Sequence, residues 1–174
     1  LVICEPKKLK DERGFFCESF RKDSLENLLG YSLNFCQENL SESKYGVLRG
    51  LHFQIEPNAQ SKLVSVIKGK ILDVTVDIRK NSKFYGQSFS IELDDKTNKQ
   101  LFIPKGFAHG FVVLSKMARV SYKVDNYYAP ENDRSIAFDD KDLAIDWKLP
   151  YEHLQLSNKD KSNPTLANTK ELFE

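Results

Sequence analysis

The sequence has few of the features that mark membrane, secreted or nucleic-acid-binding proteins. Its 174 residues include 26 basic and 25 acidic side chains, and the net charge of +1 gives no general attraction to nucleic acid or membranes. No apolar run approaches the length of a membrane span, and no signal peptide opens the chain. The first residue is Leu1, so we expect the native N-terminus to be missing. We expect a cytoplasmic protein with no nucleic-acid or membrane partner.

Cysteine is also scarce, and the glycine-rich fingerprint of dinucleotide-binding proteins is absent. Cys4, Cys17 and Cys36 lie in apolar, strand-like stretches and form no CxxC pair. We therefore expect three buried free thiols in a reducing compartment, with no disulfide. No histidine lies close to any of them in sequence, which disfavours a nucleophilic cysteine.

What the chain does contain is a series of short strands broken by turns. Many strands at a steady spacing, with little helix, predict an all-β sandwich or barrel. The length suits one domain, and leucines at helical spacing predict one early helix over Lys22–Leu29. Beyond residue 130 the pattern loosens into a segment that we expect to cover the barrel. The expected strands span residues 1–4, 13–20, 32–39, 47–55, 62–67, 71–78, 87–93, 100–103, 106–114 and 118–124.

The stretch VLRGLHFQ, residues 47–54, places Arg49 and His52 among apolar strand-forming residues. Burying a cation and an imidazole is unfavourable unless polar groups lie opposite, so we expect a cavity for an anionic, polar ligand. Residues three apart in a regular strand point to opposite faces. If both side chains line one cavity, Gly50 must break the alternation, most simply with a β-bulge. A second stretch, IPKGFAHGF, residues 103–111, repeats the pattern with His109.

A metal site is the main competing interpretation of these histidines. The segment PKGFAH, residues 104–109, fits the second cupin motif, where many cupins bind iron, manganese or zinc. The first cupin motif requires His-x-His followed by Glu, whereas here only His52 stands at that place. Two histidines without a carboxylate fall short of the three or four ligands that such a metal needs. We therefore expect no metal.

Without a metal, His52 becomes a candidate general base rather than a core histidine with satisfied hydrogen bonds. A base of this kind needs a carboxylate on its other ring nitrogen, and the sequence offers both Asp73 and Asp160 without choosing between them. Lys62 opens an apolar strand, where it either stabilises an oxyanion or lies at the surface. Tyr122 lies on the apolar face of its strand, which predicts a core tyrosine unless the barrel is hollow.

Eight ordered blocks of this chain resemble the dTDP-4-dehydrorhamnose 3,5-epimerases, a family of cofactor-free cupins in sugar-nucleotide synthesis. The resemblance covers almost the whole chain and is highly specific, because the blocks occur together and in order. The blocks are DERGFF (11–16), QEN (37–39), GVLRGLH (46–52), AQSKLV (59–64), DVTVDIR (73–79), IPKGFAHGF (103–111), YK (122–123) and LSNKD (156–160).

The resemblance implies a fold and a reaction. The fold is a cupin-type double-stranded β-helix, or jelly-roll barrel, with a few short helices. It forms one domain over residues 1–174, dimeric through an exchanged N-terminal strand. The reaction inverts C3 and C5 of a nucleotide-diphospho-4-keto-6-deoxy sugar without a cofactor. One alternative is an epimerase that inverts C3 alone, or C3 and C5, of a related substrate such as a GDP-4-keto-heptose. A lesser alternative is a metal-dependent cupin or a non-catalytic sugar-nucleotide binder.

The resemblance also implies a role for individual residues. His52 is the base with Asp160 as its partner and Asp73 nearby, Tyr122 is the acid on the opposite face of the sugar, and Lys62 holds the sugar O4. Asp133 and the following Arg stand where many members of the family have Glu-Gly, in a loop expected to cover the sugar. The implied substrate-binding residues are Arg49 and His109 at the sugar, Arg13, Phe16, Glu18, Gln37 and Asn39 at the nucleotide and diphosphate, partly from the neighbouring subunit, and Tyr128 and Asp133 in the covering loop.

Overall fold

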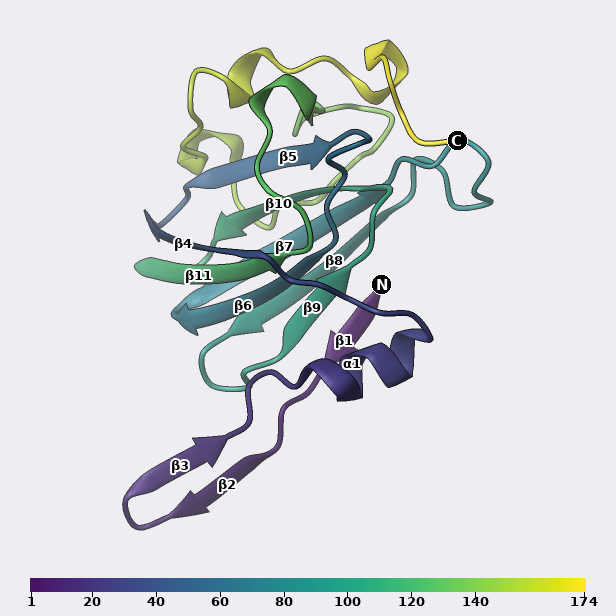
Figure 1. Ribbon diagram of the computed structural model, residues 1–174. Coiled ribbons are helices and arrows are strands. Elements are labelled where there is room, and N and C mark those ends of the chain that lie inside the picture. The colour runs from purple at the N-terminus through teal and green to yellow at the C-terminus, as the bar shows by residue number, and fades with distance from the viewer.

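The structure is a computed structural model that describes residues 1–174. Two five-stranded antiparallel sheets pack face to face as a jelly-roll barrel (Figure 1). In the first sheet the order is β1 (Val2–Cys4), β9 (Gln100–Ile103), β6 (Lys62–Lys68), β11 (Met117–Val124) and β4 (Gln37–Lys44). In the second sheet the order is β12 (Asp133–Ser135), β5 (Leu48–Gln54), β10 (Phe107–Val113), β7 (Lys70–Asp77) and β8 (Ser88–Asp94).

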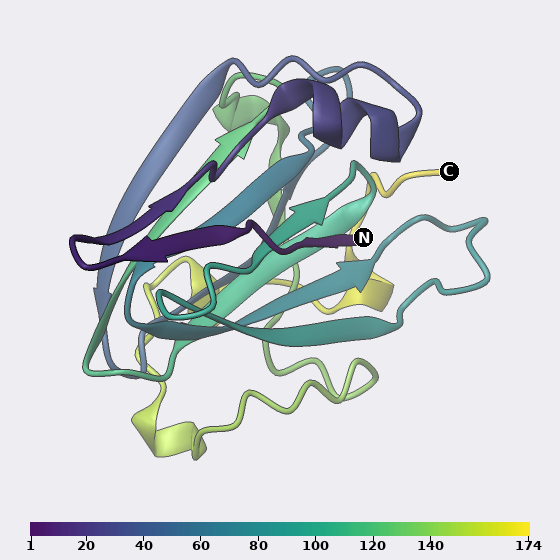
Figure 2. The ribbon, with the colours of Figure 1, turned by 90° about the horizontal axis from the view of Figure 1, so that it is seen from below.

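The remaining elements lie around these sheets. A two-stranded hairpin, β2 (Lys8–Asp11) and β3 (Gly14–Cys17), extends beyond the barrel (Figure 1). The helix α1 (Lys22–Leu29) and the C-terminal segment cover opposite sides of the barrel (Figure 2). The single-turn 3₁₀ helices are η1 (Pro130–Asn132), η2 (Tyr151–His153), η3 (Asp160–Ser162) and η4 (Leu166–Asn168). No helix is long and apolar enough to cross a membrane.

Two clusters of apolar side chains stabilise the sheets. Successive residues of β7 contribute alternately to one cluster and to the other. Leu72 and Val74 point out of the barrel, against the C-terminal segment that includes Trp147. Ile71 points into the barrel and packs with Phe111 between the sheets. Because side chains alternate along a strand, Asp73 then points into the same interior as Ile71. The barrel interior is therefore apolar at one end and polar further along β7.

The helix α1 has the predicted bounds, and its end has a clear cause. Gly30 adopts a left-handed conformation, φ 77°, and its N–H donates to the Glu26 carbonyl at 2.8 Å. Glycine adopts this conformation without steric penalty, so it is a common helix terminator. Leu25 on the inner face packs with Leu33 and Phe102, which fixes the helix against the first sheet.

Several strand boundaries differ from the sequence prediction. β4 begins at Gln37 rather than at residue 32 and continues to Lys44 through a polar stretch. Its pairing with β11 at the edge of the first sheet, rather than burial of its own side chains, makes it a strand. β2 and β12 are short and polar, and the sequence pattern missed both. The cysteines are free as expected, but they are partly buried rather than buried.

The predicted bulge at Gly50 is confirmed. His52 pairs with His109 and Arg49 pairs with Phe111, so two residues of β5 lie opposite one residue of β10. This extra residue breaks the alternation, and Arg49 and His52 line one cavity. Gly50 has φ 142°, and a Cβ there would lie 2.5 Å from the Cα of Gly110. The bulge therefore requires glycine.

We expect Gly50→Ala to destabilise the protein by about 2–3 kcal/mol, because the added methyl group strains the backbone and pushes β10 away. Urea unfolding measures this loss. Gly14→Ala is the control, since Gly14 also has a positive φ, 127°, but no atom lies within 4 Å of its added Cβ. Equal unfolding midpoints for the two variants would contradict the account of the bulge.

Candidate active site

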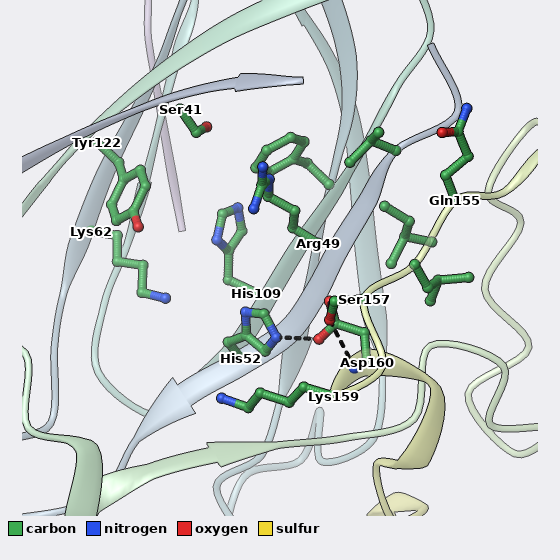
Figure 3. A pocket seen from close by; sticks show the side chains of 14 residues that line it. Ser41, Arg49, His52, Lys62, His109, Tyr122, Gln155, Ser157, Lys159 and Asp160 are labelled. Carbon is green, nitrogen blue, oxygen red and sulfur yellow. Dashed lines mark hydrogen bonds and ion pairs between the residues drawn. The ribbon is translucent and has the colours of Figure 1, made fainter. Parts of the chain in front are cut away.

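Two cavities lie between the facing sheets and share three lining residues, His52, Lys62 and Tyr122. The larger cavity has a volume of about 480 Å³ and the smaller one about 240 Å³. The larger cavity is also lined by Ser41, Val47, Leu48, Arg49, His109, Phe111, Gln155, Leu156, Ser157, Lys159 and Asp160 (Figure 3). The smaller cavity is also lined by Gln37, Asn39, Phe53, Gln54, Gln60, Tyr128 and Asp133.

His52 is held by a buried carboxylate. Its Nε2 lies 2.6 Å from Asp160 Oδ1, and the Asp160 side chain is 5% exposed. Burial alone raises the pKa of the Asp160 carboxyl, but the hydrogen bonds from His52 and Ser157 more than offset this and keep the pKa below its usual value. An ionised carboxylate on Nε2 fixes the proton there and leaves Nδ1 with a free lone pair toward the cavity (Figure 3). The pair has the form of an oriented general base.

Lys62 and Tyr122 face His52 from the other sheet. Lys62 opens β6 and Tyr122 lies on the neighbouring strand β11, whereas His52 lies on β5 of the second sheet. Burial lowers the pKa of the Lys62 ammonium to about 8, although the charges of Asp133 and Asp73 oppose this. Burial also raises the pKa of the Tyr122 phenol, so the phenol keeps its proton at neutral pH. A protonated phenol and a cation thus lie across the cavity from the imidazole.

Asp73 does not contact His52. The sequence left open whether Asp73 or Asp160 orients His52, and the distances assign this role to Asp160. Asp73 is fully buried on β7, and its Oδ2 lies 2.9 Å from His109 Nε2 on the adjacent strand. Its other oxygen, Oδ1, has no hydrogen-bond partner. Arg49 extends into the larger cavity, and its Nε donates to Ser43 Oγ at 3.1 Å. The larger cavity is therefore lined by the His52–Asp160 pair, by His109 and by the Arg49 guanidinium, whereas Asp73 lies buried beside His109 and lines neither cavity.

The smaller cavity has a different, amide-rich lining. Gln37 and Asn39 project from β4, and Gln37 Nε2 donates to Asn39 Oδ1 at 2.9 Å. The backbone N–H of Tyr128 donates to Gln37 Oε1 at 3.0 Å, and the Tyr128 hydroxyl lies 3.3 Å from Asp133 Oδ2. The predicted residues Gln37, Asn39, Tyr128 and Asp133 therefore come together here. Their side chains suit a polar ligand that donates and accepts hydrogen bonds.

Three predicted binding residues lie outside both cavities. Arg13 and Phe16 are exposed on the β2–β3 hairpin, where Arg13 pairs with Asp11 at 2.6 Å. Glu18 follows the hairpin and lines a separate hollow beside β1 and α1. None of the three lines a cavity with His52 in its own chain.

Three further residues support the site without having been singled out from the sequence. Ser157 donates to Asp160 Oδ2 at 2.9 Å, and Lys159 lines the larger cavity. Gln54 is 4% exposed, donates to the carbonyls of Asn58 and Tyr127, and accepts from Ala129 N–H at 2.8 Å. Gln54 thereby anchors the loop that carries Tyr128. The available signal was proximity, since Ser157 and Lys159 lie beside Asp160 and Gln54 lies two residues after His52.

The structure contains no cluster of side chains that could act as ligands of a metal ion. No group of three or more His, Cys, Asp or Glu side chains is placed to hold a metal ion. His52 and His109 sit directly opposite each other on β5 and β10, but each directs Nε2 to its own carboxylate. The third histidine, His153, is exposed, and its Nδ1 lies 3.4 Å from the Tyr45 hydroxyl.

Comparison with known sequences identifies the family. The sequence pattern described as dTDP-4-dehydrorhamnose 3,5-epimerase matches residues 1–168. The chain belongs to this epimerase family. It is 48% identical over 167 residues to the dTDP-4-dehydrorhamnose 3,5-epimerase of Salmonella typhimurium, which covers 95% of this chain and 90% of the relative. The predicted family and the predicted isomerase class are confirmed.

Solved structures of epimerases confirm the jelly-roll fold. The dTDP-6-deoxy-D-glucose-3,5-epimerase of Legionella pneumophila, crystallised with dTDP-4-keto-L-rhamnose, is 49% identical with a TM-score of 0.94 over 99% of this chain and 92% of that one. The 3′-monoepimerase ChmJ of Streptomyces bikiniensis, crystallised with dTDP-quinovose, is 32% identical with a TM-score of 0.88 over 95% and 83%. The same fold thus occurs in an enzyme named as a 3,5-epimerase and in one named as a 3′-monoepimerase.

Proposed function

We propose that this protein inverts C3 and C5 of dTDP-4-dehydro-6-deoxyglucose and gives dTDP-4-dehydro-L-rhamnose. The observation that carries the proposal is the placement of His52 and Tyr122 on facing sheets of one cavity, with Lys62 beside them. Family membership supports the reaction class, and the ligand of the Legionella relative supports the substrate class. The proposed reaction needs no cofactor, because both hydrogens are acidified by the ketone of the substrate.

The chemistry follows from the ketone at C4. The hydrogens at C3 and C5 are each α to this carbonyl, so His52 Nδ1 can remove one of them as a proton. The electron pair of the C–H bond then forms a C=C bond, and the carbonyl electrons move to O4. The Lys62 ammonium stabilises the negative charge on O4; one donor placed at such an oxyanion is worth roughly 3–4 kcal/mol. The sugar O4 therefore belongs beside Lys62.

Inversion requires the proton to return to the other face of the ring. A group on the side of His52 would restore the starting configuration, so the donor must come from across the cavity. Tyr122 projects from the opposite sheet and keeps its proton at neutral pH. Tyr122 gives its proton to the carbon, and the electrons return from O4 to re-form the ketone. Arg49 and His109 line the part of the cavity assigned to the sugar.

We assign the smaller cavity to the nucleotide side of the substrate, and a second copy of the chain completes it. Gln37, Asn39 and Tyr128 offer hydrogen bonds there. Arg13, Phe16 and Glu18 lie on or just after a hairpin that extends away from its own barrel (Figure 1), which suits contact with the site of a partner subunit. The proposed state is a homodimer with exchanged N-terminal strands, and the unpaired cysteines fit the reducing cytoplasm.

The proposal is tested by offering purified protein several 4-keto sugar nucleotides and following product configuration by NMR. We expect the dTDP-hexose to be inverted at both carbons, and a GDP-4-keto-heptose to react far more slowly. Inversion at C3 alone would instead support the single-carbon activity for which ChmJ is named. Turnover of none of these substrates would contradict the proposal.

The Tyr122→Phe variant tests the assignment of the acid. We expect it to exchange substrate hydrogen for deuterium in heavy water, because His52 still removes and returns a proton on its own face. Net inversion should fall by about 10²–10⁴-fold at one or both carbons. NMR in heavy water separates the two processes. Normal inversion by this variant would place the acid elsewhere.

A further inference from the structure

Arg134 joins the loop over the smaller cavity to the C-terminal tail of the chain. Its Nε and Nη2 both donate to Glu171 Oε2, at 2.9 and 2.7 Å. Its Nη1 donates to the carbonyls of Glu131 and Asp133, at 2.8 and 3.1 Å. The guanidinium is planar and presents its donors in a fixed arrangement, so it can bind the loop along one edge and the tail along another. One side chain therefore ties two segments that lie far apart in the sequence.

The tail is fixed to the barrel at the residues that follow Glu171. Phe173 packs against the apolar cluster outside the second sheet, and its ring centroid lies 6.4 Å from that of Phe53 on β5. The backbone N–H of Lys80 donates to the Phe173 carbonyl at 2.8 Å, so the tail ends beside the loop that follows β7 (Figure 1). Glu171 itself has φ 59°, a conformation that a non-glycine residue keeps only where contacts hold it. The tail therefore gives Arg134 a fixed partner.

The tie acts on a loop whose inner side chains line the smaller cavity. β12 pairs with β5, with Asp133 opposite Gln54 and Arg134 opposite Phe53. Neighbouring residues of a strand point to opposite faces, so Asp133 points into the cavity while Arg134 points outward to the tail. Tyr128, which also lines the cavity, is 56% exposed, and its hydroxyl donates to Asp133 Oδ2 at 3.3 Å. The placement of both cavity groups therefore depends on how firmly β12 is held.

The tie matters because this end of the loop has few other supports. β12 has three residues and lies at the edge of the second sheet. The buried Gln54 holds the loop at its beginning, through the Tyr127 carbonyl and the Ala129 N–H. Short edge segments with few buried contacts open at a small cost in free energy. A loop that is open part of the time lowers the apparent affinity for any ligand that needs it closed.

We propose that Arg134 is a positioning residue that, together with Glu171, holds the covering loop closed over the nucleotide side of the substrate. The inference rests on the proposed function for the identity of that ligand. Arg134 lines neither cavity, so it acts through Asp133 and Tyr128 rather than by touching the ligand. The proposed base, acid and oxyanion-stabilising lysine lie on β5, β6 and β11, inside the barrel and away from the tail. The tie therefore affects binding and leaves the proton transfers unchanged.

Calorimetric titration with dTDP and steady-state kinetics test the binding role. We expect Arg134→Met to weaken dTDP binding by about fivefold, because loss of a partly exposed ion pair lowers the closed population by about that factor. KM should rise in proportion while kcat stays unchanged, and Arg134→Lys should restore part of the affinity. Lys70→Met is the matched control, since it removes the cation of the exposed Lys70–Glu92 pair outside both cavities, and its Kd should not change. Unchanged dTDP binding in Arg134→Met, or a loss of kcat at constant KM, would overturn the inference.

Hydrogen exchange measured by mass spectrometry follows the loop itself and separates a local tie from a general loss of stability. Peptides that cover residues 126–134 should exchange about fivefold faster in Arg134→Met and in Glu171→Ala, while peptides from β7 keep their rate. The double variant should exchange no faster than Arg134→Met alone, because the two side chains act as one tie. Equal acceleration throughout the barrel, or additive effects of the two substitutions, would contradict the tie. Absence of dTDP binding by the unmodified protein would instead overturn the proposed substrate, and the exchange rates would still decide whether the tie holds the loop.

Discussion

His52→Ala is expected to abolish deuterium uptake at both C3 and C5 when the protein and its 4-keto sugar nucleotide are mixed in heavy water. His52 is the only imidazole held by Asp160, and its free nitrogen faces the cavity between the sheets. A positioned base contributes about 10²–10⁴-fold, and without it neither proton leaves at a useful rate. Mass spectrometry of the recovered sugar measures the uptake.

Two controls make the result for His52→Ala specific. His153→Ala removes an exposed imidazole outside both cavities and should leave exchange unchanged. Binding of dTDP to His52→Ala, measured by calorimetry, shows that the barrel still folds. Exchange at the original rate in a folded His52→Ala protein would remove His52 from the role of base.

Lys62→Met is expected to lower kcat by about 10²–10³-fold, because no cation then meets the charge on O4. The loss should affect both carbons, since removal of either hydrogen puts the charge on the same oxygen. Steady-state kinetics, with NMR following each carbon, measures it. Unequal losses at C3 and C5 would contradict a single position of O4 beside Lys62.

The same lysine should set the alkaline limit of activity. Burial lowers the pKa of Lys62 to about 8, and a lysine carries its charge only below its pKa. The value of kcat/KM, which reports on the free enzyme, should therefore fall as the pH rises through about 8. In Lys62→Arg the guanidinium stays charged far above this pH. The decrease of kcat/KM near this pH should therefore disappear, even if the variant is slower than the unmodified protein at every pH. Persistence of the fall would assign it to another group.

The sequence predicted most of the barrel, because its strands carry strong patterns. Apolar and polar residues alternate along residues 71–78, which is typical of a strand such as β7. The bulge at Gly50 followed from requiring Arg49 and His52 in one cavity. β12 and the part of β4 beyond residue 39 escaped prediction because their residues are polar and partner strands, rather than buried side chains, hold them extended. Edge strands leave little trace in a hydrophobic pattern.

The candidate site was only partly predictable for a related reason. The residues Arg49, His52, Lys62, His109 and Tyr122 come together as expected in the larger cavity. The choice between Asp73 and Asp160 was not readable from the residues themselves, because each could reach an imidazole until the strand register was known. In the structure Asp73 pairs with His109, while a 3₁₀ turn far along the chain brings Asp160 to His52. Lys159 and Gln54 lacked any pattern that separates them from surface and strand residues.

A single-turnover reaction in heavy water tests most directly the claim that base and acid act from opposite sheets. If His52 removes each proton and Tyr122 supplies its replacement from the other side, every inverted carbon carries one solvent deuteron. Mass spectrometry and NMR of the product at C3 and C5 read this directly. Substrate hydrogen retained at an inverted carbon would mean that one group carries the proton around the ring, and would contradict the account.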